Sequence, residues 1–219
     1  HIIGLVGLIQ SMKLNGRTQL LHIFIPNDTI EYMNQLFSIP YFSADFDILI
    51  TEVFDEKIEF DSYWIRPFPV SHGVPAIGYV FGVNDSRGKF NKKLCDELGI
   101  KGEMFAILEK NREIEINGRR ISIEEVTGKI KKGKKIVYTG DTEKLDSFPA
   151  EAYNCDILIH ESTFISQEDK KETYHSTVKE ACEVAKLLSA KKLILTHISQ
   201  RYETSEVAEE SKRYCENAI

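Results

Sequence analysis

The feature that most constrains this chain is a set of apolar segments that each run into an aspartate or a histidine. The three cases are residues 134–138 before Asp141, residues 65–70 before His72, and residues 192–196 before His197. In layered α/β proteins, reactive side chains collect where strands end and loops begin. Imidazoles and a carboxylate at several strand ends therefore indicate a metal-centred hydrolase site.

The order of the predicted elements indicates an α/β fold. We expect helices at residues 1–13, 29–37, 177–189 and from 204 onward, and strands at residues 19–26, 47–54, 57–60, 63–70, 76–83, 134–139, 155–160 and 192–197. Strands come first as a block and then alternate with helices, which favours two sheets or a mixed sheet with helices packed outside. The apolar pattern of residues 1–13 predicts a helix buried on most sides, and Asp28 is the expected N-cap of the next helix.

Residues 85–127 interrupt this scheme, because they are charged, irregular and punctuated by glycine. A hairpin is expected around Asn117-Gly118. Residues 87–135 carry fourteen Lys and Arg against eight Asp and Glu, a net charge of +6, while the rest of the chain carries −12. Nucleic-acid contacts should therefore concentrate in this segment. We expect an insertion that protrudes from a single domain spanning residues 1–219, rather than a second domain.

Composition excludes several classes of protein. No run of eighteen apolar residues occurs, so no membrane span is expected. The net charge of −6 disfavours a nonspecific polyanion binder. The cysteines lie far apart and form no Cys-x-x-Cys pair; they are Cys95, Cys155, Cys182 and Cys215. This spacing disfavours a zinc knuckle or a disulfide framework and predicts buried thiols in a reducing cytoplasm.

Each candidate metal ligand also has a plain structural interpretation. Asp141 lies between two small residues and could bridge a pair of ions, or it could form an Asx-turn after a strand. His72 and His197 could bind metal, or they could be packed histidines bonded to the backbone. His1 opens an apolar helix and could be a ligand or a tag remnant. His22 lies inside a strand and is expected to be structural.

Two further residues are candidates for proton transfer. Neighbouring side chains on a strand point to opposite faces, so if Glu161 faces the site then His160 does not. His175 precedes a helix that Ser176 or Thr177 is expected to cap. A histidine held there by a carboxylate could donate a proton to a leaving oxygen, or it could simply be a surface-loop residue.

Taken together, these motifs resemble the metallo-β-lactamase superfamily and, within it, the ribonuclease Z family. The matching stretches are Ser71-His72-Gly73-Val74-Pro75, Tyr138-Thr139-Gly140-Asp141-Thr142, His160-Glu161-Ser162-Thr163, His175-Ser176-Thr177, and residues 196–202. The resemblance covers almost the whole chain. It implies a metallo-β-lactamase-type αββα sandwich, in which two mixed β-sheets are flanked by helices, with a protruding arm insertion.

The resemblance also implies a site and a mechanism. His1 resembles the final histidine of the motif His-x-His-x-Asp-His, whose other ligands would lie upstream of this sequence. His1, His72, Asp141 and His197 would hold two Zn²⁺ ions per subunit, or Mn²⁺ or another divalent ion, with Asp141 as the bridge. A metal-bridging hydroxide would attack the phosphodiester. His175, oriented by Glu161, would protonate the departing 5′-oxygen of the trailer.

The implied substrate is precursor transfer RNA, from which a zinc-dependent endoribonuclease removes the 3′ trailer and leaves a 3′-hydroxyl. Residues 85–127 match the family's flexible arm, a substrate-binding exosite. The basic residues expected to contact substrate there are Lys89, Lys92, Lys93 and Lys101. The family resemblance further implies a cytoplasmic homodimer with no membrane partner.

Two other functions remain open. A hydrolase of small phosphodiesters or sulfate esters with the same fold would need neither the arm nor His175-Ser176-Thr177, so their presence counts against it. A degenerate scaffold that has lost its ligands is the non-enzymatic alternative. The ligand residues within this sequence are intact, which disfavours the scaffold.

Overall fold

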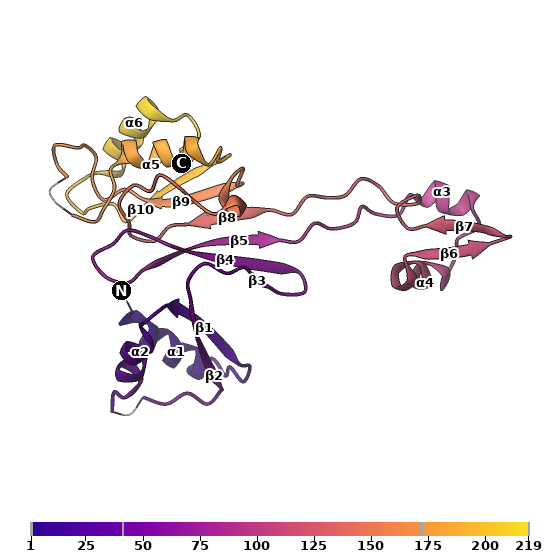
Figure 1. Ribbon diagram of the computed structural model, residues 1–219, viewed down its shortest axis with the longest axis horizontal. Helices are drawn as coiled ribbons and strands as arrows, with labels where there is room; N and C mark the ends of the chain where they lie inside the picture. Colours follow the sequence, from indigo (N-terminus) through magenta and orange to yellow (C-terminus); the bar gives the residue numbers. More distant parts are fainter. Residues whose placement is uncertain (1, 41, 171–172, 219) are drawn as a thin grey trace. The chain divides into compact units, whose positions relative to one another are not determined.

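A six-stranded mixed sheet organises the larger part of the chain (Figure 1). Its strands, in spatial order, are β10 (Leu193–Thr196), β9 (Ile157–Glu161), β8 (Lys135–Tyr138), β5 (Ile77–Val83), β4 (Tyr63–Pro69) and β3 (Ile58–Glu59). Strands β8, β9 and β10 are parallel, β5 is antiparallel to β8, and β3 is antiparallel to β4. The parallel strands end at one edge, so the loops after β8, β9 and β10 lie together there.

The computed structural model describes residues 2–40, 42–170 and 173–218. The chain divides into two compact units. The first runs to Gly82 and resumes at Lys135, and the second is Val83–Lys134. None of the helices in the described residues combines the length and the apolar character of a membrane span.

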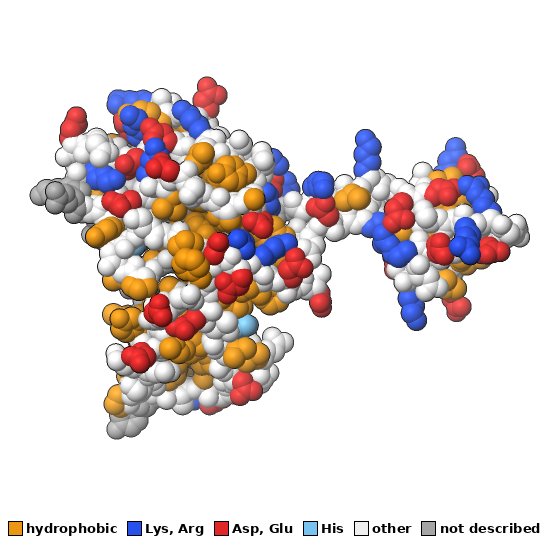
Figure 2. Space-filling view, viewed as in Figure 1, with side chains coloured by type: hydrophobic (Ala, Val, Ile, Leu, Met, Phe, Trp, Pro, Cys, Tyr) orange, Lys and Arg blue, Asp and Glu red, His pale blue; other side chains and the backbone are white. Residues whose placement is uncertain are grey.

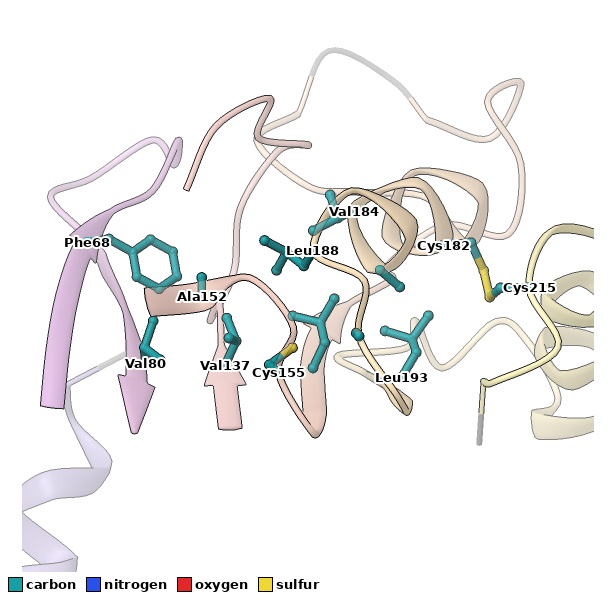
Figure 3. Packing of buried hydrophobic residues seen from close by; sticks show 13 residues of the cluster. Phe68, Val80, Val137, Ala152, Cys155, Cys182, Val184, Leu188, Leu193 and Cys215 are labelled. Atoms are coloured by element: carbon teal, nitrogen blue, oxygen red, sulfur yellow. A yellow bond between two sulfur atoms is a disulfide. The ribbon is translucent and has the colours of Figure 1, made fainter. Parts of the chain in front are cut away.

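The main core lies between the sheet and helix α5 (Val178–Leu187), as Figure 3 shows. Val137, Leu158 and Leu193 of the parallel strands are fully buried against Val184 and neighbouring α5 side chains. Burying each such side chain stabilises the fold by about 1.5–3 kcal/mol relative to leaving it exposed. The same helix begins at the loop that carries His175, so core packing fixes that end of the site.

Helix α6 (Thr204–Tyr214) packs on α5, and a disulfide joins Cys182 of α5 to Cys215 just after α6 (Figure 3). The expectation that all cysteines are free thiols was wrong for this pair. Residues 33 apart in sequence meet because the two helices pack together, which spacing alone does not reveal. Cys95 and Cys155 are buried thiols, and burial raises the pKa of each.

A smaller parallel pair of strands lies in the N-terminal region. Strand β1 (Leu21–Pro26) pairs with β2 (Ile48–Val53), and helix α2 (Ile30–Phe37) forms the crossover between them. The η1 turn (Ala150–Ala152) belongs to the C-terminal half. Half-buried Tyr79 of β5 donates a hydrogen bond to the carbonyl oxygen of Phe24 at 3.0 Å, and desolvation raises the pKa of Tyr79 to about 12. The phenol is therefore neutral near pH 7, where its hydrogen bond links the two sheets.

Two local predictions in this region were wrong. Asp28 does not cap α2, because its backbone is left-handed (φ 62°) and Glu52 of β2 accepts from the amides of Thr29 and Ile30 at 2.8 and 2.9 Å. Helix α1 (Gly4–Leu14) is not buried on most sides within the described residues. Its buried member is Ile9, while Leu14 is 86% exposed.

The second unit has a hydrophobic cluster of its own, made of Cys95, Ile100, Leu108, Ile121, Ile123 and Val126. It contains α3 (Lys92–Glu97), α4 (Met104–Asn111), β6 (Glu113–Ile116) and β7 (Arg119–Ser122). The hairpin expected at Asn117-Gly118 is confirmed, since β6 and β7 pair antiparallel on either side of it. The expectation of irregular structure elsewhere in this segment was wrong, because two short helices cover the hairpin.

Candidate metal centre

The loops after β8 and β10 bring Asp141 and His197 together. Strand β8 ends at Tyr138, and Gly140 then turns the chain in a left-handed conformation (φ 66°) that places Asp141 at the sheet edge. His197 follows β10 directly and is itself left-handed (φ 53°), which a non-glycine residue seldom adopts. Its Nε2 lies 3.4 Å from Asp141 Oδ2. Backbone strain of this kind persists where the surrounding structure enforces it, and it clusters at functional sites.

Four of the predicted site residues converge at this edge. Asp141, His175 and His197 each place one ligand atom within 4.8 Å of the others. The rings of His175 and His197 stack with centroids 5.1 Å apart and an interplanar angle of 15°. The His72 ring lies 5.2 Å from that of His175. We call these four residues, His72, Asp141, His175 and His197, the histidine–aspartate cluster.

Buried Glu161 organises two of the histidines. One carboxylate oxygen, Oε1, accepts from His175 Nδ1 at 2.7 Å and from the amide of Thr142 at 3.0 Å. The other, Oε2, accepts from the Thr163 hydroxyl at 2.8 Å and from the Thr163 amide at 3.0 Å. The side chain has no exposed surface, so these hydrogen bonds offset the cost of burying the carboxylate.

The hydrogen-bond network fixes which nitrogen of His197 carries a proton. The Thr163 hydroxyl has a single proton, and it donates that proton to Glu161. Thr163 Oγ1 must therefore accept from His197 Nδ1–H across 2.8 Å. In the neutral ring, Nε2 of His197 then carries a lone pair directed at Asp141. Two acceptor atoms 3.4 Å apart repel one another unless a cation or a proton lies near both.

His72 and His175 follow the same pattern. His72 Nδ1 lies 3.2 Å from the carbonyl oxygen of Tyr174, which can only accept, so Nδ1 is the donor. His175 Nδ1 donates to Glu161 in the same way. In each neutral imidazole, Nε2 is therefore left with its lone pair. Histidines that bind metal show the same arrangement, because one ring nitrogen donates its proton to a nearby acceptor and the other is free to bind the ion. Imidazole nitrogens and one carboxylate form a donor set that suits a borderline divalent ion such as Zn²⁺.

Comparisons with known proteins identify relatives of this chain. A family model described as "Beta-lactamase superfamily domain" matches residues 100–198. The chain is 44% identical over 217 residues to a protein named Ribonuclease Z from Thermococcus sibiricus, which covers 99% of this chain and 71% of that protein. This chain belongs to the ribonuclease Z family. At 43% identity, the Ribonuclease Z of Pyrococcus horikoshii matches 100% of the chain and 72% of its own length.

A solved structure resembles this ribonuclease Z family member in fold. The short form of human tRNase Z superposes with a TM-score of 0.59 at 20% identity, covering 92% of this chain and 69% of that chain. Together with the two sheets and their flanking helices, this confirms the predicted metallo-β-lactamase-type α/β fold.

The remaining predicted residues of this family member lie elsewhere. His1 lies outside the described residues. The four lysines of the predicted exosite, Lys89, Lys92, Lys93 and Lys101, are exposed on the second unit. His22 bonds Thr51 at 2.8 Å across the β1–β2 pair. His160 is fully buried beside the backbone carbonyl of Glu161, and desolvation lowers its pKa.

Two residues of the site had no predicted role. Thr163 joins Glu161 to His197, and Tyr174 holds His72 through its carbonyl oxygen. Thr163 belongs to the stretch His160-Glu161-Ser162-Thr163. Its hydroxyl lies two residues after the Glu161 carboxylate, so the sequence could have predicted a hydrogen bond between them. Tyr174 acts through its backbone, so the identity of its side chain gave no indication of that contact.

Proposed function

We propose that this member of the ribonuclease Z family is a zinc-dependent endoribonuclease that removes the 3′ trailer from precursor transfer RNA. The observation that supports this most directly is the histidine–aspartate cluster, in which imidazole Nε2 atoms and Asp141 meet at one edge of the sheet. Family membership supplies the reaction, since the relatives are named for it.

The proposed cofactor is a pair of Zn²⁺ ions per subunit, with Mn²⁺ or another divalent ion as the alternative. His72 and His197 would act as imidazole ligands, Asp141 would bridge, and His1 would contribute a further imidazole. When bound, such ions supply an activated water and stabilise negative charge on the phosphoryl oxygens.

His175 is proposed to move the proton that the leaving oxygen needs. Cleavage to a 3′-hydroxyl transfer RNA and a 5′-phosphorylated trailer breaks the bond between phosphorus and the 3′-oxygen. The leaving group is therefore the 3′-oxygen of the transfer RNA, and the expectation of a departing 5′-oxygen was wrong. Glu161 holds Nδ1 of His175, so its Nε2 is the atom from which the 3′-oxygen would receive a proton.

The second unit is proposed to be the arm that binds the substrate. Several of its cations are already paired: Arg87 with Glu109, Arg112 with Glu124, Arg119 with Glu125, and Lys132 with Asp85. Figure 2 shows acidic and basic side chains interspersed over this unit. The exposed lysines of the predicted exosite are then the best candidates for phosphate contacts, which position a nucleic acid without reading its sequence.

The decisive assay incubates the full-length protein with a precursor that carries a 3′ trailer. We expect cleavage to a 3′-hydroxyl and a 5′-phosphate, loss of cleavage with chelator, and recovery with Zn²⁺. His197→Ala should be inactive, while His22→Ala, a histidine of the β1–β2 pair, should retain activity. Hydrolysis of a small phosphodiester without any cleavage of the precursor would exclude the proposed substrate.

The assembly and location are separate proposals. We propose a homodimer that acts in the cytoplasm, as the family resemblance implies. Light scattering of the purified protein tests the first, where a monomeric mass at working concentration would contradict it. Fractionation of source cells tests the second.

A further inference from the structure

We infer that the aromatic ring of Tyr174 stacks on a nucleobase that flanks the scissile phosphodiester and so positions the RNA at the histidine–aspartate cluster. The inference rests on the proposed function and adds a specific role for one side chain. It makes Tyr174 a positioning residue for single-stranded RNA, not a member of the proton-transfer or metal-binding groups.

The backbone of Tyr174 is held between two residues of the cluster. Its carbonyl oxygen accepts from His72 Nδ1 at 3.2 Å, and the next residue is His175. The Tyr174 ring meets the His72 ring edge to face, with centroids 6.3 Å apart and an interplanar angle of 80°. Contacts made by Tyr174 itself therefore hold its side chain at the edge of the site.

Gly73 provides the surface on which the ring lies. A Cβ at position 73 would approach Tyr174 Cδ2 to 3.0 Å and Cε2 to 3.2 Å, closer than side-chain carbons normally pack. A side chain at that position would require the ring to shift by a few tenths of an ångström. Glycine at position 73 thus permits a close approach between the ring and the loop that carries His72.

Tyr174 nevertheless remains 52% exposed. A single exposed aromatic needs no explanation by itself. This one is different because a hydrogen bond of its backbone, an edge-to-face contact of its ring with His72 and a close approach to Gly73 place it beside a centre proposed to act on a phosphodiester. Proteins recognise unpaired RNA bases largely by stacking them on aromatic side chains, and such stacking tolerates any base. That tolerance suits a nucleotide whose identity varies among transfer RNAs.

Fluorescence tests the stacking directly. The metal-loaded full-length protein is mixed with a precursor that carries an uncleavable methylenephosphonate at the scissile position and 2-aminopurine on either side of it. We expect quenching at one of the two positions with the wild type and with Tyr174→Phe. Quenching should be lost with Tyr174→Leu, which keeps bulk without a π face. Tyr32→Ala is the matched control, because Tyr32 of α2 is equally exposed at 53%.

Kinetics with a cleavable precursor give the second readout. Tyr174→Leu should raise KM about ten-fold, while Tyr174→Phe and Tyr32→Ala should leave KM near the wild-type value. If the wild type fails to cleave the precursor, the proposed function is wrong. If the wild type cleaves it and Tyr174→Leu matches it in both KM and quenching, the stacking role alone is wrong. If Tyr174→Leu unfolds differently from the wild type, Tyr174→Met takes its place in the same comparison.

Discussion

His175 occupies a position where two roles compete. Its Nδ1 donates to buried Glu161, while its ring stacks on His197 and places a nitrogen within 4.8 Å of an Asp141 carboxylate oxygen. A metal ligand and a proton donor both need Nε2 to face the reacting groups, so the orientation of the ring suits either role. The two roles differ in the effect of losing the ring: loss of a metal ligand lowers the amount of bound metal, whereas loss of a proton donor lowers turnover alone.

We predict that His175→Ala lowers turnover by about 10²- to 10⁴-fold while bound metal stays near the wild-type level. The reason is that the other cluster residues hold the ions and His175 supplies only the proton. Turnover and metal content are measured on the same preparation, the latter by elemental analysis. His197→Ala is the control that should lose both. Parallel loss of metal in His175→Ala would make that residue a ligand instead.

His160 should make the fold sensitive to acid. Burial lowers its folded-state pKa below the ordinary value of about 6.5, so the unfolded chain binds its proton more readily. The resulting contribution to the free energy of unfolding is fully present above about pH 6.5. It is lost as the pH falls below that value, by at most about 1.4 kcal/mol for each pH unit.

The test compares urea unfolding of the wild type and of His160→Gln at pH 7.5 and pH 5, with chelator present throughout. The wild type should lose more of its unfolding free energy between these values than the variant does. An identical loss in both proteins would show that other groups set the acid sensitivity.

At the residue scale, the sequence predicted the side chains that have distinctive chemistry at strand ends. His72, Asp141 and His197 could be proposed because each follows an apolar segment. Thr163 and the carbonyl of Tyr174 could not, because their roles depend on segments far apart in sequence that meet only in the fold.

Among the elements, the helix starts show how local and tertiary capping differ. Helix α5 begins with a capping box between Thr177 and Glu180, and the sequence predicted Ser176 or Thr177 as the cap. Helix α2 takes its capping acceptor from Glu52, which lies on β2 and comes more than twenty residues later in the chain. A cap supplied by another element leaves no local signature.

We predict that Glu52→Ala lowers the free energy of unfolding by about 1–2 kcal/mol, because two amides at the start of α2 lose their charged acceptor. Glu52→Gln keeps one acceptor oxygen and should cost less than half as much. Chemical denaturation of the three proteins provides the measurement. Equal stability of Glu52→Ala and wild type would mean that water replaces the carboxylate without penalty.

The elements that the sequence missed are short. Helices α3 and α4 span Lys92–Glu97 and Met104–Asn111, which is too little chain for apolar periodicity to stand out among so many charges. Long alternating and periodic segments, such as those that form β5 and α5, were predicted within one or two residues of their ends.

For the molecule as a whole, we expect the two units to have different functions, catalysis in the first and substrate binding in the second. The histidine–aspartate cluster lies in the first unit, and the local excess of positive charge lies in the second. Gly82 and Lys135 pair across β5 and β8, so a two-residue Asn-Gly turn can join them and replace Val83–Lys134.

We predict that this deletion weakens binding of the precursor at least ten-fold and lowers the salt dependence of what remains, since fewer phosphates are neutralised. Hydrolysis of a small phosphodiester should persist, because the cluster is left intact. Binding is measured by filter retention over a range of salt concentrations. Unchanged precursor affinity in a folded deletion protein would refute the arm assignment.

The order of strands and helices predicted an α/β fold, and the family resemblance identified that fold as the metallo-β-lactamase type. The Cys182–Cys215 disulfide and the separate core of the second unit did not follow from the sequence. Both depend on which helix faces pack together, and one chain's pattern of apolar residues does not determine that.

The measurement that bears most directly on the whole account is an anomalous difference map, recorded at the zinc edge from crystals of the zinc-loaded full-length protein. We predict density at roughly 2.0–2.2 Å from both Asp141 and His197 Nε2. Zinc bound elsewhere, with Asp141 and His197 making no bond to it, would contradict the claim that this cluster is the metal centre.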